Sequence, residues 1–244
     1  MKVICLDYGH GGHDPGAVGN GLKEKDLTLA IGKKVKGMLE KQGLKVIETR
    51  SDDRYVSLTE RANISNRNKA DALVSLHVNS ASNPNARGFE IFTTRGQTPA
   101  DKLADEIGKE LQGAFPNVPF RADWSDGDLD KEENFTVIAK ATAPACLVEM
   151  GFIVNAQDAQ MLKNEQDRIA QAIAKGVLNY LGITYKGGNG MANSNSQAVS
   201  SWAKEAWDWA IKQGITDGTN PQGAITREQV VTMLHRYHKQ VAKK

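Results

Sequence analysis

Residues 3–16 read VICLDYGHGGHDPG, an apolar run that passes directly into a glycine-rich loop. The first six residues have the length and aliphatic composition of a buried β-strand. The glycines that follow allow a tight bend, and the loop carries two histidines. This arrangement predicts a strand that delivers polar, ligand-type side chains to a loop at its end.

Beyond this stretch, short apolar runs alternate with helical patterns, which predicts an α/β domain over residues 1–182. The candidate strands are short and aliphatic: Val3–Tyr8, Leu44–Glu48, Ala72–Val78, Phe89–Thr93 and Ala145–Met150. The candidate helices are amphipathic: Leu27–Leu39 with a stop at Gly43, a helix that begins at Ser57, Pro99–Gln112 and Asp167–Leu181. Glu60 stands three residues after Ser57, which is capping-box spacing.

The composition changes abruptly after Leu181. Residues 183–199 are rich in Gly, Asn and Ser and cannot bury enough apolar surface to offset their ordering entropy. We expect a flexible linker there. In residues 200–244, Trp202, Ala206 and Trp209 share a helix face, and Thr226 can cap a second helix. The sequence therefore predicts a small all-α module at the C-terminal end.

Charge is distributed unevenly along the 244 residues, whose formal net charge is +2. Residues 198–244 carry seven Lys or Arg and four Asp or Glu, whereas the rest of the chain is close to neutral. This excess is far below the dense basic patch of nucleic-acid-binding proteins, but it favours contact with an anionic polymer. We expect no nucleic-acid partner, and the oligomeric state stays open.

Hydrophobicity argues against a membrane protein. No apolar run approaches the roughly 18 residues of a membrane span, and the first residues lack the long apolar segment of a secretory signal. We expect no membrane insertion, and synthesis in the cytoplasm without a signal peptide. Cys5 and Cys146 each lie in an apolar run, which favours buried free thiols over a disulfide or a thiolate metal site.

Four ionisable residues have the chemistry of a metal-dependent hydrolase. His10 lies in the glycine-rich loop, Glu24 starts a helix, and His77 and Glu149 are embedded in apolar strands. A buried carboxylate costs several kcal/mol unless a cation, hydrogen bonds or a metal compensates it. Two imidazoles and one carboxylate would form a three-ligand zinc site, and a further glutamate would move the proton. His13 is an alternative ligand, because loop spacing enforces no geometry.

Taken singly, these residues also have ordinary structural explanations. A loop histidine, a hydrogen-bonded core histidine and an acid at a helix N-terminus are all common. The glycines match neither the P-loop nor the dinucleotide-binding fingerprint, which argues against nucleotide binding.

Three longer motifs carry a family resemblance: residues 7–17 (DYGHGGHDPGA) with Glu24, residues 75–79 (SLHVN) and residues 149–155 (EMGFIVN). Together they resemble the zinc-dependent N-acetylmuramoyl-L-alanine amidases of the AmiC-like type over about residues 2–182. The resemblance implies a mostly parallel twisted sheet flanked by helices. It also implies that His10, Glu24 and His77 bind Zn²⁺ and that Glu149 is the catalytic carboxylate. The implied reaction is hydrolysis of the peptidoglycan amide bond between N-acetylmuramic acid and L-alanine.

Other segments carry weaker expectations. Leu58–Asn63 also matches the family, and we expect Arg61 in it to pair with an acid. Trp124–Asn134 is expected to form an irregular loop that borders the cleft.

The tail, residues 200–244, is similar to an S-layer homology module, which implies binding to a secondary cell-wall polymer. A packing or dimerisation unit is the alternative. An amidase joined to a wall-targeting module indicates a phage endolysin that acts on the cell wall after release, with a host enzyme as the alternative origin.

Three other functions stay open at this stage. A glycosidase built on Glu24, Glu90 and Glu149 is one, although that mechanism needs neither histidine. A zinc peptidase that cuts within the stem peptide is another. The third is a wall-binding protein whose catalytic domain is silent.

Overall fold

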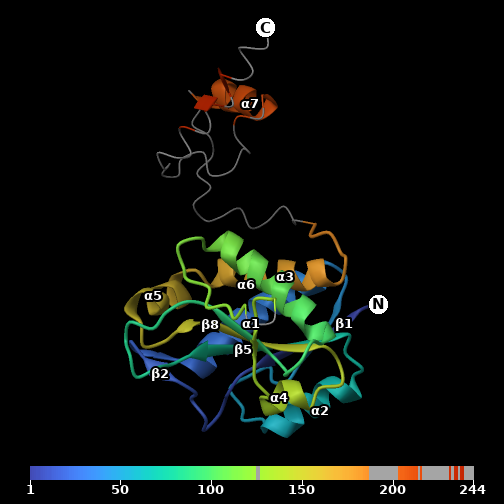
Figure 1. Cartoon of the computed structure of the whole chain (residues 1–244). Helices are drawn as coiled ribbons and strands as arrows, with labels where there is room; N and C mark the ends of the chain where they lie inside the picture. Colours follow the sequence, from blue (N-terminus) through green and yellow to red (C-terminus); the bar gives the residue numbers. More distant parts are fainter. Residues whose placement is uncertain are drawn as a thin grey trace. The chain divides into compact units, whose positions relative to one another are not determined.

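The computed structural model describes residues 1–124, 127–186 and 203–213, together with residues 215, 231, 234–235 and 237–238. The chain divides into two compact units, Met1–Lys186 and Gly187–Lys244. The first unit contains all four residues of the expected site, and its helices and several of its strands are labelled in Figure 1.

A six-stranded sheet forms the centre of the first unit, in the order β4-β1-β5-β8-β6-β7. Its strands are β1 (Val3–Tyr8), β4 (Lys45–Glu48), β5 (Ala72–Asn79), β6 (Glu90–Thr93), β7 (Lys131–Glu132) and β8 (Ala145–Phe152). All neighbours are parallel except β6 and β8, which are antiparallel. The expected α/β class with a mostly parallel sheet is confirmed.

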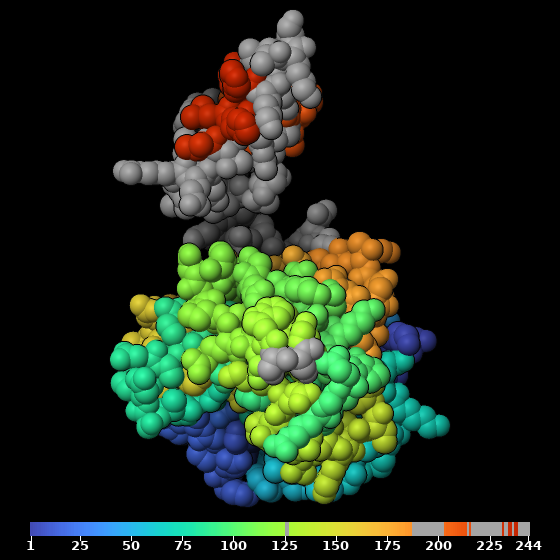
Figure 2. Space-filling model, in the orientation of Figure 1, coloured from blue at the N-terminus to red at the C-terminus, as the bar shows by residue number. Residues whose placement is uncertain are grey.

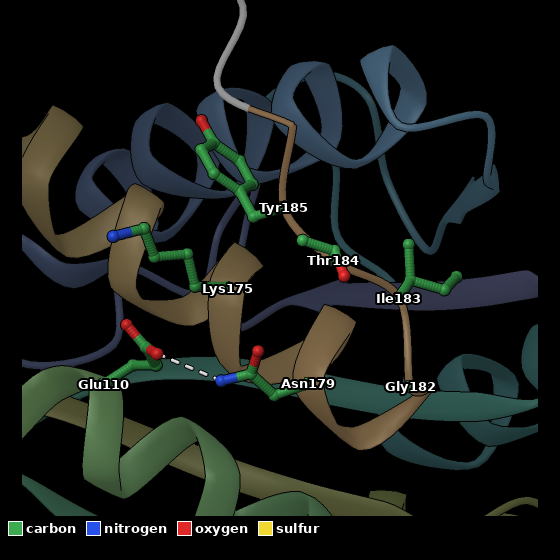
Figure 3. A pocket seen from close by; sticks show the side chains of 7 residues that line it. All are labelled: Glu110, Lys175, Asn179, Gly182, Ile183, Thr184 and Tyr185. Atoms are coloured by element: carbon green, nitrogen blue, oxygen red, sulfur yellow. Dashed lines mark hydrogen bonds between the residues drawn. The ribbon is translucent and has the colours of Figure 1, made fainter.

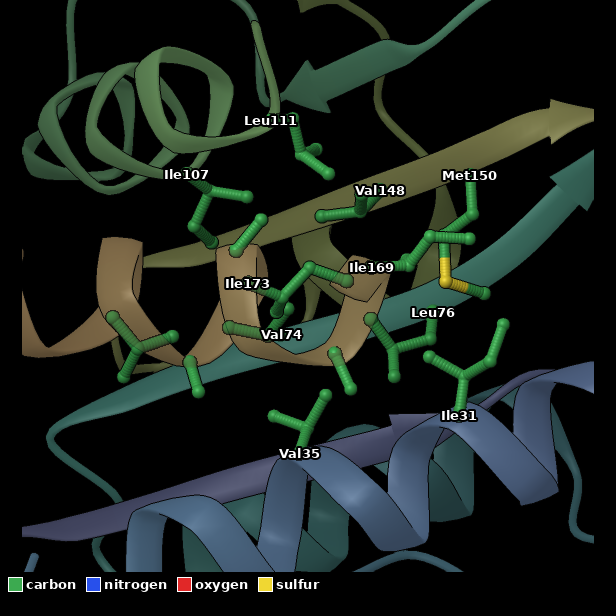
Figure 4. Packing of buried hydrophobic residues seen from close by; sticks show 14 of the residues in the cluster. Ile31, Val35, Val74, Leu76, Ile107, Leu111, Val148, Met150, Ile169 and Ile173 are labelled. Carbon is green, nitrogen blue, oxygen red and sulfur yellow. The ribbon is translucent and has the colours of Figure 1, made fainter. Parts of the chain in front are cut away.

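One face of this sheet carries the larger core. Three helices contribute to it: α1 (Glu24–Lys41), α3 (Pro99–Ala114) and α6 (Gln166–Tyr180). Figure 4 shows their apolar side chains directed at β5 and β8, with Ile31 and Val35 from α1, Ile107 and Leu111 from α3, and Ile169 and Ile173 from α6. These side chains are buried, so their removal from water stabilises the fold.

The opposite face carries a smaller cluster beside α2 (Leu58–Arg67) and α4 (Thr136–Ala139). Side chains alternate between the two faces of a strand, so Leu73, Ser75 and His77 of β5 share this face. Leu73 packs in the small cluster, whereas His77, nearer the end of the strand, is partly exposed. The sheet therefore presents polar groups beyond the edge of the small cluster.

Several element boundaries differ from the sequence predictions. α1 begins at Glu24, the expected helix start, and extends beyond the apolar stripe Leu27–Leu39 at both ends, with Glu24 and Asp26 in its first turn, where acids favour the helix dipole. Ser57 Oγ accepts a hydrogen bond from Glu60 N at 3.4 Å, but the Glu60 carboxylate pairs with Arg67 at 2.6 Å. The expected cap is therefore present without its reciprocal bond.

Some short elements carried no sequence signal. They are the hairpin β2 (Val18–Gly19) and β3 (Leu22–Lys23), the strand β7, the helix α4 and the helix α5 (Ala156–Asn164). β7 falls inside the segment 124–134 that was expected to be irregular, and it pairs with β6. In Figure 2, α3 and the loop that follows it (green to yellow-green) cover much of the face turned to the viewer.

The end of the first unit also differs from the prediction. Residues 183–186, expected within the linker, lie against the domain: Ile183 and Tyr185 pack on the core. Lys186 exchanges two hydrogen bonds with the Gln42 side chain, at 2.8 and 2.9 Å. The chain therefore leaves this unit at Lys186 rather than at residue 182.

The second unit contains α7 (Lys204–Lys212), which includes Ala206 and Trp209 of the predicted apolar face. The ring of Trp209 lies 6.1 Å from that of Tyr237, centroid to centroid. Trp202 and the predicted start of the second helix at Thr226 lie outside the described residues.

Two expectations about the whole chain can be compared with the structure. Cys5 and Cys146 are buried free thiols, as predicted. No helix among the described residues is both long and apolar enough to span a membrane.

Candidate metal centre and catalytic carboxylate

Three separated segments bring His10, Glu24 and His77 together. His10 lies in the loop after β1, Glu24 is the first residue of α1, and His77 lies near the end of β5. One ligand atom of each lies within 4.8 Å of the other two. Over the described part of the chain, this is the only group of three or more His, Cys, Asp or Glu residues placed in this way.

The Glu24 carboxylate lies between the two rings. Its Oε1 atom is 3.2 Å from His10 Nε2 and 2.9 Å from His77 Nδ1, and it accepts a hydrogen bond from Val78 N at 2.9 Å. Its Oε2 atom accepts a hydrogen bond from Ala17 N at 2.8 Å. Burial alone would raise the pKa of Glu24, but the hydrogen bonds from the two histidines hold that pKa well below its usual range. Glu24 is therefore a carboxylate, the form that binds a cation.

This donor set fits a divalent metal of the zinc type. Two imidazole nitrogens and one carboxylate oxygen are the ligands of many catalytic zinc sites, which keep a further position for water or substrate. His10 and His77 meet edge to face, with ring centroids 5.1 Å apart, so their nitrogens converge on the carboxylate from different directions. The chemistry and the spacing of these residues agree with the expected ligand set.

Asp14 orients the His10 ring. Its Oδ2 atom lies 2.8 Å from His10 Nδ1, on the far side of the ring from Glu24. When Nδ1 donates to this carboxylate, Nε2 carries the free lone pair and points at the cluster. His10 itself adopts a left-handed backbone conformation, with φ of 63°, which is uncommon for a residue other than glycine. The loop therefore holds His10 in a strained backbone conformation beside the cluster.

Two glycines make room for these rings. A Cβ atom on Gly9 would lie 2.7 Å from His77 Nε2, a distance that would force the imidazole to move. A Cβ atom on Gly16 would lie 2.6 Å from His10 Cδ2, and the φ of 64° at Gly16 also favours glycine. At these two positions the backbone approaches the candidate ligands too closely for any residue larger than glycine.

Arg61 ties the strand end to the loop, and it pairs with an acid as expected. Its Nη1 atom lies 2.8 Å from Asp7 Oδ1 in a fully buried ion pair, and Nη2 donates to His10 O at 2.7 Å. Burial would raise the pKa of Asp7, but Arg61 and then His77 lower that pKa below its ordinary value. A buried pair of this kind anchors the backbone that carries His10, because either partner alone would be an uncompensated charge.

Glu149 stands beside this cluster on the neighbouring strand. It is the register partner of His77 across the parallel β5–β8 pairing and of Glu90 across the antiparallel β6–β8 pairing. Among the described residues, its buried Oε2 atom has no hydrogen-bond partner. Burial, followed by the negative charges of Glu24 and Glu90, raises the pKa of Glu149 well above its ordinary value. Within the residues that the structure describes, Glu149 therefore keeps one carboxyl oxygen without a partner beside the candidate ligands.

Two other residues considered from the sequence, His13 and Glu90, are not part of the candidate metal centre. His13 is exposed and stacks against Tyr55, with ring centroids 4.3 Å apart, and it is not part of the three-residue group. Glu90 is engaged by Arg121 and Lys131, at 2.6 and 2.7 Å, which leaves it unsuited to act as a free acid in a glycosidase pair. The sequence did not predict that Asp14 orients the His10 ring or that two cations surround Glu90. Only the four-residue spacing of Asp14 from His10 offered a hint.

A separate hollow lies between α3, α6 and the segment Gly182–Tyr185 (Figure 3). Asn179 Nδ2 donates to Glu110 Oε1 at 3.0 Å, and Lys175 Nζ lies 5.8 Å from the Tyr185 ring centroid. None of its lining residues belongs to the candidate metal centre.

Comparison with known proteins places the chain in a family. A family model described as N-acetylmuramoyl-L-alanine amidase matches residues 4–179. The sporulation-specific N-acetylmuramoyl-L-alanine amidase of Bacillus subtilis (strain 168) is 38% identical over 185 residues, which covers 74% of this chain and 67% of that protein. The endolysin of Bacillus phage SPP1 is 33% identical over 250 residues, which covers 95% of this chain and 90% of the endolysin.

A solved structure shares the fold. The catalytic domain of CwlV, an N-acetylmuramoyl-L-alanine amidase from Bacillus (Paenibacillus) polymyxa var. colistinus, superposes with a TM-score of 0.68 at 34% identity. The superposition covers 75% of this chain and all of that domain. The chain belongs to the N-acetylmuramoyl-L-alanine amidases, enzymes that hydrolyse the amide bond between N-acetylmuramic acid and L-alanine in peptidoglycan.

Proposed function

We propose that this amidase is zinc-dependent, with His10, Glu24 and His77 as the metal ligands and Glu149 as the catalytic acid and base. The observation that supports this most strongly is the convergence of three ligand atoms within 4.8 Å, beside a carboxyl oxygen that has no partner among the described residues. When bound, zinc supplies a Lewis acid that polarises the scissile carbonyl and makes water more acidic.

The chain's own residues then account for the proton transfers. Glu149, in its carboxylate form, accepts a proton from the attacking water, and the water oxygen joins the lactyl carbonyl carbon. As the C–N bond breaks, Glu149 delivers this proton to the nitrogen of L-alanine, which leaves as a free amine. Asp14 holds His10 in the tautomer that directs Nε2 at the cluster.

Mass spectrometry of fragments from purified walls, digested with and without a chelator, tests this proposal. The digest should gain L-alanine amino termini and no new reducing ends, and the chelator should abolish the reaction. New reducing sugars would indicate a glycosidase. A new amine on any other residue would indicate a peptidase that cuts within the stem peptide. An unchanged wall would indicate a silent binding protein.

The second unit supports a further part of the proposal, that the protein is a phage endolysin whose residues 200–244 hold it on a secondary wall polymer. The alignment with the SPP1 endolysin spans 95% of this chain, so it extends beyond the catalytic unit. Trp209 and Ile211 of α7 are exposed. Tethering would raise the local enzyme concentration at an insoluble substrate without any change in the active site.

Sedimentation of the full chain with intact walls and with walls stripped of secondary polymer tests this second part. We expect the unmodified chain to bind intact walls more strongly than stripped walls. Trp209→Ala should weaken binding to intact walls more than binding to stripped walls. Lys212→Arg in the same helix, which keeps the positive charge, is the control and should leave binding to both preparations unchanged. Equal binding to both wall preparations would leave the tail as a packing or dimerisation unit.

A further inference from the structure

Two cations share one buried carboxylate on the strand next to Glu149. Glu90 of β6 is 4% exposed. Its Oε1 atom accepts hydrogen bonds from Arg121 Nε at 2.6 Å and Lys131 Nζ at 2.7 Å, while its Oε2 atom accepts one from Asn79 Nδ2 at 2.6 Å. A single cation would neutralise Glu90, so this group carries one positive charge in excess.

The excess charge is available to solvent. The side chain of Arg121 is 45% exposed and that of Lys131 is 28% exposed. Within the described ranges, the Arg121 side chain donates one hydrogen bond, from Nε to Glu90. Its two terminal nitrogens make none there. A guanidinium group has a flat array of donors that matches a carboxylate, so the unused edge of Arg121 can receive one.

Both cations are held in place before any ligand binds. The Arg121 guanidinium carbon lies 5.3 Å from the centroid of the Phe152 ring, and Arg121 N donates to Phe89 O at 2.9 Å. Lys131 Nζ lies 5.9 Å from the centroid of the Phe92 ring. Cation–π contacts and the bonds to Glu90 restrict both side chains, which lowers the entropy lost when a ligand binds.

The strand register places these cations near Glu149. Glu90 is the partner of Glu149, and Phe152, under Arg121, is the partner of Asn79 across the β5–β8 pairing. Neighbouring strands lie about 4.8 Å apart, and both cations are bonded to the Glu90 carboxylate, so they lie close to Glu149 on its β6 side. A carboxylate one residue beyond L-alanine lies roughly 7 Å from the scissile amide, at about 3.5 Å per extended residue. Since Glu90 lies one strand spacing from Glu149 and both cations are bonded to the Glu90 carboxylate, this reach is of the same order as the separation of Glu149 from the cations.

We propose that Arg121 and Lys131 bind the free carboxylate of the second stem-peptide residue, and so orient the peptide side of the substrate across Glu149. The inference rests on the proposed amidase function, since it assumes that the scissile amide lies at Glu149. In peptidoglycan the residue after L-alanine is D-glutamate linked through its side chain, so its α-carboxylate is free unless it is amidated. The site therefore prefers a free carboxylate to a carboxamide at that position.

The test compares two soluble substrates with the full-length enzyme. Both are N-acetylmuramoyl tripeptides with L-alanine, a γ-linked second residue and L-lysine; one has D-glutamate and the other D-isoglutamine as the second residue. We expect kcat/KM of the unmodified chain to be about tenfold to a hundredfold higher for the glutamate substrate. Arg121→Gln should lose most of this ratio through a higher KM for the glutamate substrate, with little change for the isoglutamine substrate. Lys131→Gln should lose part of it.

Arg168→Gln is a matched control. Arg168 also stacks on a phenylalanine, 4.6 Å from the Phe115 ring centroid, and pairs with a glutamate, 3.8 Å from Glu165. It should leave the substrate ratio unchanged. Equal losses of Arg121→Gln on both substrates, or no preference in the unmodified chain, would overturn the inference while leaving the amidase function intact. If neither substrate releases its tripeptide with a free L-alanine amino terminus, the result would instead contradict the proposed function.

Discussion

Glu149 and His77 are partners across the parallel β5–β8 pairing, so the carboxyl group and the imidazole lie side by side on one face of the sheet. His77 turns its Nδ1 atom to the Glu24 carboxylate, at 2.9 Å, whereas the Oε2 atom of Glu149 has no partner among the described residues. In the proposed mechanism these neighbouring positions have different tasks, His77 in binding the metal and Glu149 in moving a proton.

Glu149→Gln should lower kcat by about a hundredfold to ten-thousandfold, the usual contribution of general acid–base catalysis. The amide has nearly the same shape as the carboxyl group but cannot accept and return a proton. Zinc stoichiometry, measured by elemental analysis, should match that of the unmodified chain. A variant that loses zinc as well as activity would assign Glu149 to the metal rather than to proton transfer.

Asp14→Asn should weaken zinc binding by about tenfold to a hundredfold, because the carboxylate at His10 Nδ1 sets the tautomer of that ring. Competition with a chromogenic chelator measures the affinity directly. Asp52→Asn is the control, since Asp52 is exposed and its ion pair with Arg54 is long, at 3.9 Å. Equal affinities of the Asp14 variant and the unmodified chain would show that the bond does not orient the ligand.

Gly9→Ala should displace the His77 ring, because the added methyl group would lie 2.7 Å from Nε2. We expect a large loss of zinc affinity and activity, with the sheet still formed as judged by circular dichroism. Gly37→Ala in α1 is the matched control, because nothing lies within 4 Å of the position that its methyl group would take. That control should keep its zinc and gain about 0.5–1 kcal/mol of stability, the usual advantage of alanine over glycine in a helix.

Asp130→Asn should make stability less dependent on pH. Asp130 is 2% exposed, and burial together with the neighbouring carboxylates raises its pKa to about 7. A carboxyl group with a raised pKa binds its proton more tightly in the folded chain, so stability falls as pH rises from about 4 to about 7. In the unmodified chain Thr93 Oγ1 donates a hydrogen bond to Asp130 at 2.5 Å. The asparagine side chain keeps an oxygen that can accept this bond, but it cannot ionise.

Urea unfolding at pH 5 and pH 8 measures this effect. The stability of the Asp130 variant relative to the unmodified chain should rise by about 2–3 kcal/mol between the two pH values, at roughly 1.4 kcal/mol for each pKa unit. Asp167→Asn, at an exposed position on α6, should show no such change. A difference that is the same at both pH values would mean that Asp130 is ionised in the folded chain throughout.

The parts of the fold predicted well are those with a strong local period. The predicted strand Val3–Tyr8 has the same limits as β1. The predicted strand Ala145–Met150 begins where β8 begins and ends two residues before it, since β8 continues to Phe152. The two-residue strands β2, β3 and β7 were missed because so few residues carry no period of their own. β7 exists only because β6 offers backbone partners for Lys131 and Glu132.

The sequence alone determined the class of the fold and the identity of four polar residues, His10, Glu24, His77 and Glu149, because hydrophobic periodicity and the order of motifs are local properties of the chain. Only the tertiary structure decided that three of them meet around one point, and that Arg121 and Lys131 converge on Glu90 beside the fourth. These contacts join residues far apart in the chain, so they depend on strand order and register. A pattern of period two or 3.6 contains neither, because it records which face a side chain takes and not which strand lies next to it.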